Sequence, residues 1–303
     1  EMQTRTKRRA IRLVGLLLLA ALFLSCTPAG VGVWRWLGTV SGFGDWPQEP
    51  ELMEVHIMDV GKADAILIRC GSRSALLDAG HGVSAESVID YLYRHDVRKL
   101  DYLIMSHPDR DHIGGMPQIL RELPVSFFVQ GRISDNLLPD SLEYKDLQAA
   151  LKETEVPQII LRPGESVSIG VAQLTALGPL KEYKNTNDSS LVLRLSCLDF
   201  TALFCGDMEK GAEQDLLTSQ QDIHADLLKV GHHGSKTSSM LEFLCEVAPK
   251  YAAISVGPDR NELPREEVLA RLEQLGAELY QTDTDGSIVF LYDGKDVVIK
   301  TDK

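Results

Sequence analysis

The sequence predicts an α/β fold in which two sheets pack together and carry helices on their outer faces. Short apolar runs bounded by turn residues alternate with amphipathic helical patterns along most of the chain, without an internal repeat or a low-complexity tract. The 303 residues are enough for one large domain, and 44% hydrophobic with 25% charged residues is ordinary for a globular protein. Strands that alternate with helices pack most readily as layers.

The expected strands and helices follow from these patterns in chain order. The first three apolar runs indicate consecutive antiparallel strands, because a GSRS turn separates the second from the third. They are Val55–Met58, Ala65–Cys70 and Ala75–Leu77, and later strand candidates are Tyr102–Met105, Leu191–Leu195, Thr201–Phe204, Leu227–Val230 and Ala252–Val256. Ser84 is expected to cap a helix that runs to Arg94, a further helix follows Gly115, and Pro264 opens a helix that stops at Gly276.

The N-terminal residues have the layout of a secretory signal or a membrane anchor. Basic side chains precede the apolar run Leu13–Leu24, an arrangement that leaves the basic end in the cytoplasm. If Cys26 in FLSC carries lipid, the segment is a lipoprotein signal; if it does not, Leu13–Trp34 is about long enough to span a bilayer. We expect an extracytoplasmic domain that is anchored to the cell membrane by this segment or by lipid on Cys26, or is secreted if the segment is cleaved.

Three segments are predicted along the chain: residues 1–36 as the basic N-terminus with its signal or anchor, 37–50 as a linker rich in Gly and Pro, and 51–303 as the globular domain. The net charge of −13 repels polyanions over most of the surface, which counts against broad nonspecific binding of nucleic acid. The cysteines show no CxxC spacing, so neither a zinc ribbon nor a disulfide framework is indicated, and Cys70, Cys197 and Cys205 are expected in the core.

The segment SHPDRDHIGG, residues 106–115, gathers two histidines and two aspartates directly after an apolar strand. They are His107, Asp109, Asp111 and His112. In an extended loop, residues 107, 109 and 111 would point to one side, while the adjacent Asp111 and His112 could face two different ions. Imidazole nitrogens with carboxylate oxygens suit zinc or manganese, and Gly114 and Gly115 let the backbone turn close to the ions.

Two later segments carry further ligand types at the ends of expected strands. ALFCGD ends at Asp207, and LLKVGHHG contains His232 and His233. Ligands at the carboxyl ends of strands open into the crevice in which α/β proteins do their chemistry. Taken with the first loop, Asp207 becomes a candidate bridging carboxylate rather than a simple turn residue.

In order and spacing, LLDAG, SHPDRDHIGG, CGD and LKVGHHGSKTSS resemble the metallo-β-lactamase superfamily. MDVGKADAILI and NTNDSSLVLRL are similar to the hydrolase domain of the ComEC family of DNA-uptake proteins, over about residues 52–300. The resemblance implies an αββα sandwich of two mixed sheets with helices on the outer faces. The multispanning channel of that family has no counterpart here, so we do not expect this chain to import DNA alone.

The resemblance also implies a site with two divalent metal ions, zinc or manganese. The implied metal ligands are His107, Asp109, Asp111, His112, Asp207, His232 and His233, of which either or both of the last two bind, and Asp78 would buttress the ligand loop. Asp109 stands where the superfamily commonly has a histidine, which favours manganese. No histidine lies between His112 and His224, so one ligand position is left for Asn187, Asp188 or water.

The function expected from these residues is metal-dependent hydrolysis, as a phosphodiesterase or nuclease that acts on DNA outside the cytoplasm. Asp111 or Asp207 could accept a proton, and His232 or His233 could steady the departing oxygen. The candidate substrate contacts are Lys236, Ser235, Asn187 and Ser190, although residues 185–190 also fit a polar turn. Two alternatives stay open: a hydrolase of small or cell-wall phosphoesters or lactones, and a non-catalytic, metal-stabilised binding protein. No obligate protein partner is indicated.

Overall fold

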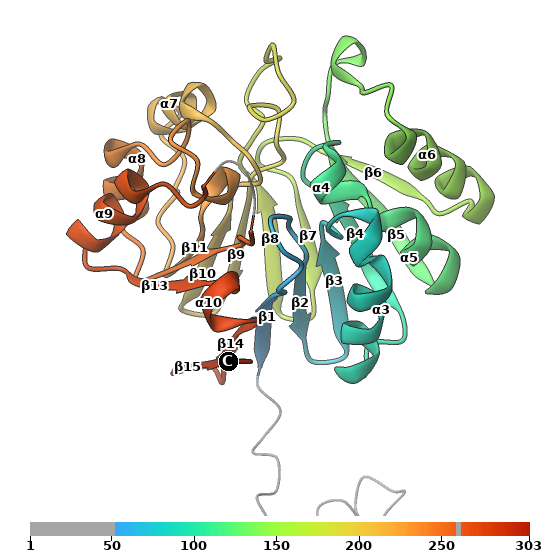
Figure 1. Cartoon of the computed structure of the whole chain (residues 1–303), viewed down its shortest axis with the longest axis horizontal. Coiled ribbons are helices and arrows are strands. Elements are labelled where there is room, and N and C mark those ends of the chain that lie inside the picture. Colours follow the sequence, from blue (N-terminus) through green and yellow to red (C-terminus); the bar gives the residue numbers. More distant parts are fainter. Residues whose placement is uncertain (1–51, 259–261) are drawn as a thin grey trace, which may run out of the picture. The chain divides into compact units, whose positions relative to one another are not determined.

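The computed structural model describes residues 52–258 and 262–303. Cys26 and the predicted signal or anchor therefore lie outside the described residues, and the division of the chain at residues 36 and 50 stays a prediction. In the described part, strands form an eight-stranded and a seven-stranded sheet, each with parallel and antiparallel pairs, and helices flank both (Figure 1). The predicted two mixed sheets with outer helices are confirmed. Among the described helices, none combines the length and hydropathy needed to cross a bilayer.

The first sheet has the strand order β15-β14-β1-β2-β3-β4-β5-β6. Its strands are β1 (Met53–Ile57), β2 (Ile66–Cys70), β3 (Arg73–Leu77), β4 (Leu100–Met105), β5 (Val125–Gly131), β6 (Gln158–Leu161), β14 (Ile288–Tyr292) and β15 (Val297–Thr301). β1, β2 and β3 are consecutive antiparallel strands, as predicted, and β3 to β6 are parallel. The loops that follow β3 and β4 therefore lie at the same edge of the sheet.

The second sheet has the strand order β13-β12-β11-β10-β9-β8-β7. Its strands are β7 (Ser166–Ile169), β8 (Ala172–Ala176), β9 (Leu193–Cys197), β10 (Phe200–Phe204), β11 (Leu227–Lys229), β12 (Tyr251–Ile254) and β13 (Glu278–Gln281). β10 to β13 are parallel, which gathers the segments after β10, β11 and β12 at one edge.

The helices divide between the two sheets (Figure 1). On the side of the first sheet lie α3 (Ala85–Arg94), α4 (Arg110–Ile113), α5 (Met116–Glu122) and α6 (Leu142–Thr154). On the side of the second lie α7 (Lys210–Thr218), α8 (Leu241–Val247) and α9 (Glu266–Gln274). Shorter turns are α10 (Thr282–Asp285), η1 (Gly82–Ser84), η2 (Asp135–Leu137) and η3 (Gly231–Gly234).

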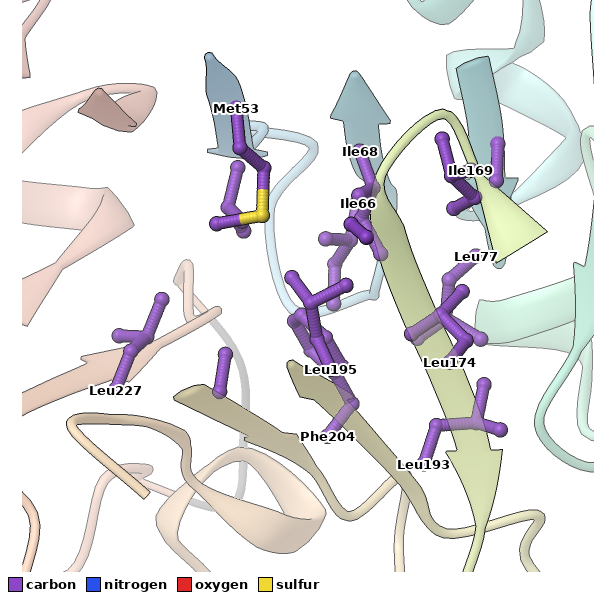
Figure 2. Packing of buried hydrophobic residues seen from close by; sticks show 14 of the residues in the cluster. Met53, Ile66, Ile68, Leu77, Ile169, Leu174, Leu193, Leu195, Phe204 and Leu227 are labelled. Atoms are coloured by element: carbon purple, nitrogen blue, oxygen red, sulfur yellow. The ribbon is translucent and has the colours of Figure 1, made fainter. Parts of the chain in front are cut away.

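The main core lies between the two sheets, where side chains from β1, β2 and β3 meet side chains from β8, β9 and β10 (Figure 2). Strand β2 shows how the sequence builds this layering. Ile66 and Ile68 point into the core between the sheets, while Leu67 joins a second cluster beneath α3, α5 and α6. Because alternate residues of a strand face opposite sides, a strand covered on both faces must be apolar throughout.

Some local expectations are corrected by the structure. Ser84 precedes α3, but its side chain makes no capping hydrogen bond because the residue also ends the turn η1. The helix expected from Pro264 begins two residues later, at Glu266. It ends before Gly276, and this glycine has a positive φ of 76°. Cys70, Cys197 and Cys205 are buried free thiols, as expected.

Candidate metal centre

Three loops from both sheets form the candidate site. The ligand loop follows β4, Asp207 follows β10, and the two adjacent histidines follow β11 in the turn η3. The Gly206 carbonyl accepts from His232 N at 3.0 Å, which joins the second loop to the third, and the Ser106 carbonyl accepts from Leu191 N at 2.8 Å, which joins the ligand loop to the segment before β9. The packing of the two sheets thus brings together residues that lie a hundred positions apart in the sequence.

The two carboxylate oxygens of Asp207 face different pairs of histidines. Oδ1 lies 3.3 Å from His112 Nε2 and 3.7 Å from His233 Nε2. Oδ2 lies 3.9 Å from His107 Nε2 and 3.7 Å from His232 Nε2. An aspartate whose two oxygens face two groups of ligands has the placement expected of a carboxylate that bridges two cations.

A buried polar network sets the orientation of the two histidines of the ligand loop. The Ser106 hydroxyl donates to Asp78 Oδ2 at 2.6 Å, so its oxygen can accept from His107 Nδ1 at 3.0 Å. His112 Nδ1 donates to the same carboxylate at 2.8 Å. Each Nδ1 therefore donates to this network, and each Nε2 is the ring nitrogen that faces Asp207. Asp78 occupies the buttressing position that the resemblance implied.

The histidines of η3 are oriented by the second sheet. His233 is buried, and its Nδ1 donates to the Ser255 carbonyl at 2.8 Å, which again leaves Nε2 as the free ligand atom. His232 is 21% exposed, with Nδ1 3.2 Å from the Thr237 hydroxyl and 3.3 Å from a carboxylate oxygen of Glu209. Both histidines have positive φ angles, 49° and 52°, in the left-handed region that histidine visits more readily than most residues.

The donor set fits a divalent cation centre. Among the described residues, five atoms at this site are buried without a hydrogen-bond partner: the Nε2 atoms of His107, His112 and His233, and Oδ1 of Asp207 and of Asp64. Buried polar atoms are rarely left unpaired, because the loss of their hydration costs about 1–3 kcal/mol each. Lone pairs that converge at metal-ligating separations account for this arrangement. Three groups that overlap at His112 have ligand atoms close enough to hold an ion: His107/His112/Asp207, Asp111/His112/His233 and Asp64/Asp78/His112.

Charges within the cluster shift the pKa values of its members. Burial opposes ionisation of Asp207, but His112 and His233 hold its pKa well below the usual range. Burial disfavours the charged form of His112, yet Asp207 and Asp78 raise its pKa well above the ordinary value. Burial lowers the pKa of His107, and His112 lowers it further. The pKa values of Asp207 and His112 thus move in opposite directions, as those of two partners in an ion pair do.

The ligand loop differs from the extended loop that was expected. Arg110–Ile113 forms the helical turn α4, because the Asp109 carbonyl accepts hydrogen bonds from both His112 N and Ile113 N. Asp109, 40% exposed, keeps Oδ2 3.8 Å from His107 Nε2. Asp111 Oδ2 lies 3.8 Å from His233 Nε2, so neighbouring ligands still reach different parts of the cluster.

The glycine pair that follows has a steric reason. A Cβ on Gly115 would lie 2.3 Å from the Ala79 carbonyl oxygen, and one on Gly114 would lie 2.4 Å from Gly82 N. The backbones of the ligand loop and of the loop after β3 therefore touch directly. Hydrogen bonds from Ala79 N to the His112 carbonyl, at 2.7 Å, and from Gly115 N to the Gly80 carbonyl, at 3.2 Å, join them.

The predicted substrate contacts lie around the cluster rather than in it. Ser190 Oγ accepts from Asp207 N at 3.2 Å, which makes it a support for the bridging residue. Ser235 pairs with the hydroxyl of Thr237, and Lys236 is exposed beside Pro264 and Glu262 at the wall of an open pocket.

The turn at residues 185–190 supports a helix as well as the site. The Asn187 carbonyl accepts from Ser190 N at 3.0 Å. Asp188 Oδ1 accepts from Glu209 N and Ala212 N, both at 3.2 Å, so its carboxylate caps the start of α7. This engagement removes Asp188 from the position left open for a missing ligand, and His232 lies on that side of Asp207 instead.

Four charged residues at the site were missed by sequence reasoning. Lys62 Nζ lies 2.6 Å from Asp111 Oδ2, and the fully buried Lys229 lies 2.9 Å from Asp64 Oδ2, while Glu209 approaches His232. A buried lysine costs several kcal/mol unless it is paired, so its presence in the apolar run LLKVG was a signal that a buried acid must lie nearby. The partner, 165 positions away, could not be read from the sequence.

His81 approaches the site as well. Burial lowers its pKa, whereas the charge of Asp111 raises it, which places the ring near the ligand loop. The remaining histidines lie elsewhere: His56 is buried between Glu54 and Tyr91, and packs edge-on against His95.

Comparison with known proteins agrees with this geometry. Residues 58–258 match the family described as the Metallo-beta-lactamase superfamily. ComE operon protein 3 of Bacillus subtilis (strain 168) is 31% identical over 259 residues, which cover 79% of this chain and 33% of that protein. Competence protein ComA of Neisseria gonorrhoeae is 29% identical over 283 residues, 90% of this chain and 38% of that protein. The chain thus spans about a third of the length of these relatives.

Similarity to solved structures concerns the fold. CmlA, a diiron β-hydroxylase from Streptomyces venezuelae, superposes with a TM-score of 0.55 at 11% identity, over 85% of this chain and 59% of that one. At that identity the likeness shows the arrangement of the two sheets and their helices. The assignment of the site is based on the residues of this chain alone.

Proposed function

This chain belongs to the metallo-β-lactamase superfamily and is related to the ComEC competence proteins, and we propose that it is a metal-dependent phosphodiesterase that acts on DNA. The observation that supports this most is the convergence of four imidazole Nε2 atoms on the two oxygens of one buried carboxylate, Asp207. Such His/Asp clusters are typical of the two-metal site of the superfamily.

The donors divide into two sets around Asp207. His107 and His232 face its Oδ2, and Asp109 lies beside His107; we call these three residues the Oδ2 half. His112 and His233 face its Oδ1, and Asp111 lies beside His233; we call these three residues the Oδ1 half. Mixed nitrogen and oxygen donors suit zinc or manganese. Two such ions would polarise a phosphoryl group and make an attacking water more acidic.

Asp111 and Asp207 are assigned as metal ligands rather than as proton acceptors. Burial opposes ionisation of both carboxylates, but neighbouring histidines, and in Asp111 also Lys62, hold the pKa values well below the usual range, so both carboxylates are weak bases and good ligands. His232 is the partly exposed imidazole of the cluster, and its Nδ1 lies 3.3 Å from a carboxylate oxygen of Glu209 while its Nε2 faces Asp207. Glu209 therefore orients this ring toward the Oδ2 side of the centre.

Phosphodiesters are the favoured substrates because a doubly cationic centre complements the charge of a phosphoryl transition state. Lys236, exposed just beyond η3, supplies a further positive charge that could attract a phosphate neighbouring the scissile one. DNA as the substrate is supported by the relation to proteins named for competence. The net charge of −13 means that this attraction would be confined to the site.

The test is turnover by the chelator-treated chain after addition of manganese or zinc. Single-stranded DNA, duplex DNA, a bis(nitrophenyl) phosphate and a lactone would be assayed in parallel. We expect metal-dependent cleavage of DNA and of the small phosphodiester. Cleavage of the small phosphodiester or of the lactone alone would replace DNA by a small substrate. No turnover despite bound metal would favour a metal-stabilised binding protein.

We also propose that the domain lies outside the cytoplasmic membrane, held by residues 1–36 or by lipid on Cys26. The support is the basic stretch followed by the apolar run Leu13–Leu24. Protease added to intact cells whose wall has been removed should digest the domain while a cytoplasmic marker survives. Full protection of both proteins would overturn this topology.

A further inference from the structure

The two halves of the metal centre differ in how their carboxylates are compensated. In the Oδ1 half, Asp111 is the carboxylate contributed besides Asp207, and Lys62 Nζ lies 2.6 Å from its Oδ2. This ion pair is largely shielded from water, with exposed side-chain fractions of 22% for Lys62 and 13% for Asp111. The ammonium thus contacts the oxygen that faces His233, where a divalent cation would also bind.

A second lysine adds to the positive charge behind the same half. Lys229 Nζ lies 2.9 Å from Asp64 Oδ2, and both side chains are 1% exposed. Asp64 in turn lies 3.8 Å from His233 Nδ1 and 4.0 Å from His112 Nδ1. Lys229 therefore neutralises the carboxylate that would otherwise strengthen the basicity of these two imidazoles.

The Oδ2 half has no such compensation. Within residues 52–258 and 262–303, no Lys or Arg nitrogen lies within 4.0 Å of a carboxylate oxygen of Asp109 or Asp207. Their ion-pair partners there are histidines of the cluster. A cation that enters this half meets two carboxylates without displacing an ammonium, whereas one that enters the other half must separate Lys62 from Asp111.

We propose that Lys62 makes the two cation positions unequal: its ammonium holds Asp111 until a second divalent ion displaces it, so the Oδ2 half loads first. The inference rests on the proposed metal centre but not on any particular reaction. Lys62 acts through Asp111 and is therefore a positioning residue. The ammonium competes with a divalent ion for the same carboxylate oxygen and repels it at that distance, so the free energy of loosening the ion pair weakens the second binding event.

The experiment is a calorimetric titration of Mn²⁺ into the chelator-treated full chain. The wild type should show two binding events, with the second at least about tenfold weaker than the first. Lys62→Met keeps the length of the side chain and removes the charge, so it should tighten the weaker event by about tenfold and leave the tighter one unchanged. Lys62→Arg should preserve the wild-type pattern, and Asp111→Asn should abolish the weaker event while the tighter one persists.

Lys181→Met, which removes an exposed lysine paired with Asp215, serves as the matched control and should change neither event. Thermal unfolding followed by circular dichroism checks that each variant is folded, and Lys62→Gln replaces Lys62→Met if the latter is not. Two events of equal affinity in the wild type would overturn the proposal, as would unchanged or weaker binding in the uncharged variants. Two unequal events without turnover of any substrate would contradict the proposed function alone.

Discussion

The two sheets hold their shares of the metal centre in different ways. The first sheet supplies the ligand loop, whose histidines are fixed by side-chain hydrogen bonds to Ser106 and Asp78. The second sheet supplies His232 and His233 from the turn η3, in which both have positive φ angles and one bonds to a backbone carbonyl. One share depends on a buried carboxylate, and the other depends on backbone conformation.

This difference shows which substitutions would misplace the ligands that each sheet supplies. A change of one side chain behind the ligand loop can turn an imidazole away from the centre without moving the backbone. In the second sheet, the orientation of the histidines follows from the turn itself and from what anchors its ends. Asp207 connects both, because each of its oxygens faces histidines from both sheets.

The largest effect is expected from Asp207→Asn, which removes the charge common to both halves. Hydrolysis should fall by orders of magnitude, on the scale of about 10²-fold or more seen when a group that stabilises the reacting centre is lost. The rate constant for a small phosphodiester, measured with saturating manganese, provides the measurement. Asp222→Asn, at a carboxylate that is 69% exposed near the same sheet, is the control. Full activity of the Asp207 variant would contradict the bridging assignment.

A smaller effect is expected from Asp78→Asn, which tests the side-chain support of the first sheet. The amide cannot accept all three bonds that Asp78 now accepts from Ser106 N, Ser106 Oγ and His112 Nδ1, so the rings lose their fixed orientation. Metal affinity should fall about 10–100-fold.

The variant and its control are made at positions with the same backbone conformation. Asp78 has a φ of 58°, which asparagine adopts as readily as aspartate, and the exposed Asp96 has a φ of 57°. Asp96→Asn should therefore bind metal like the wild type. Equal affinities in the two variants would mean that the carboxylate does not orient the ligands, and the comparison between the sheets would fail.

The smallest effect on the metal ligands themselves is expected at the anchor of η3 in the second sheet, where the change concerns stability. Buried Glu213 accepts from Ser239 N at 2.5 Å and Met240 N at 2.9 Å, just beyond the histidine turn, and burial raises its pKa to about 7. The folded state therefore keeps a proton that the unfolded state loses near its ordinary pKa of 4.5. The free energy of unfolding should decrease as pH rises from 4.5 to 7, by up to about 3 kcal/mol.

Glu213→Gln should lack this part of the pH dependence, because glutamine does not titrate. Urea unfolding at pH 5 and pH 8 compares the variant with the wild type and with Glu246→Gln, a change at an exposed position of α8. The Glu246 variant should follow the wild type. If the free energy of unfolding changed equally between pH 5 and pH 8 in all three proteins, the titration of Glu213 would not be the cause of the pH dependence.

Much of the fold and the ligand set could be predicted from the sequence, because both depend on local patterns. Strand β4 is apolar and runs directly into the ligand loop, and β10 and β11 end in the same way at Asp207 and at the histidines. Parallel pairing places the ends of β10 and β11 at one edge of the second sheet, and the packing of the two sheets brings the end of β4 to them. The early antiparallel strands were predicted for the same reason, since short turns join them.

The remainder depends on contacts that no local pattern encodes. The Lys229–Asp64 pair joins β11 of the second sheet to the loop after β1 in the first, and only the packing of the sheets brings them together. Lys62 was missed for the same reason, because its partner Asp111 lies in a different loop. The helical turn α4 was missed because an acidic, histidine-rich loop carries no apolar period, although the Asp109 carbonyl closes the turn.

The direct backbone contact between the ligand loop and the loop after β3 also governs motion. The amide of Ala79 bonds to the carbonyl of His112, and the amide of Gly115 bonds to the carbonyl of Gly80, so neither loop can open without releasing the other. Hydrogen exchange at these amides would then report one shared opening event with one free energy. We therefore expect the ligands of the first sheet to move together with the loop after β3.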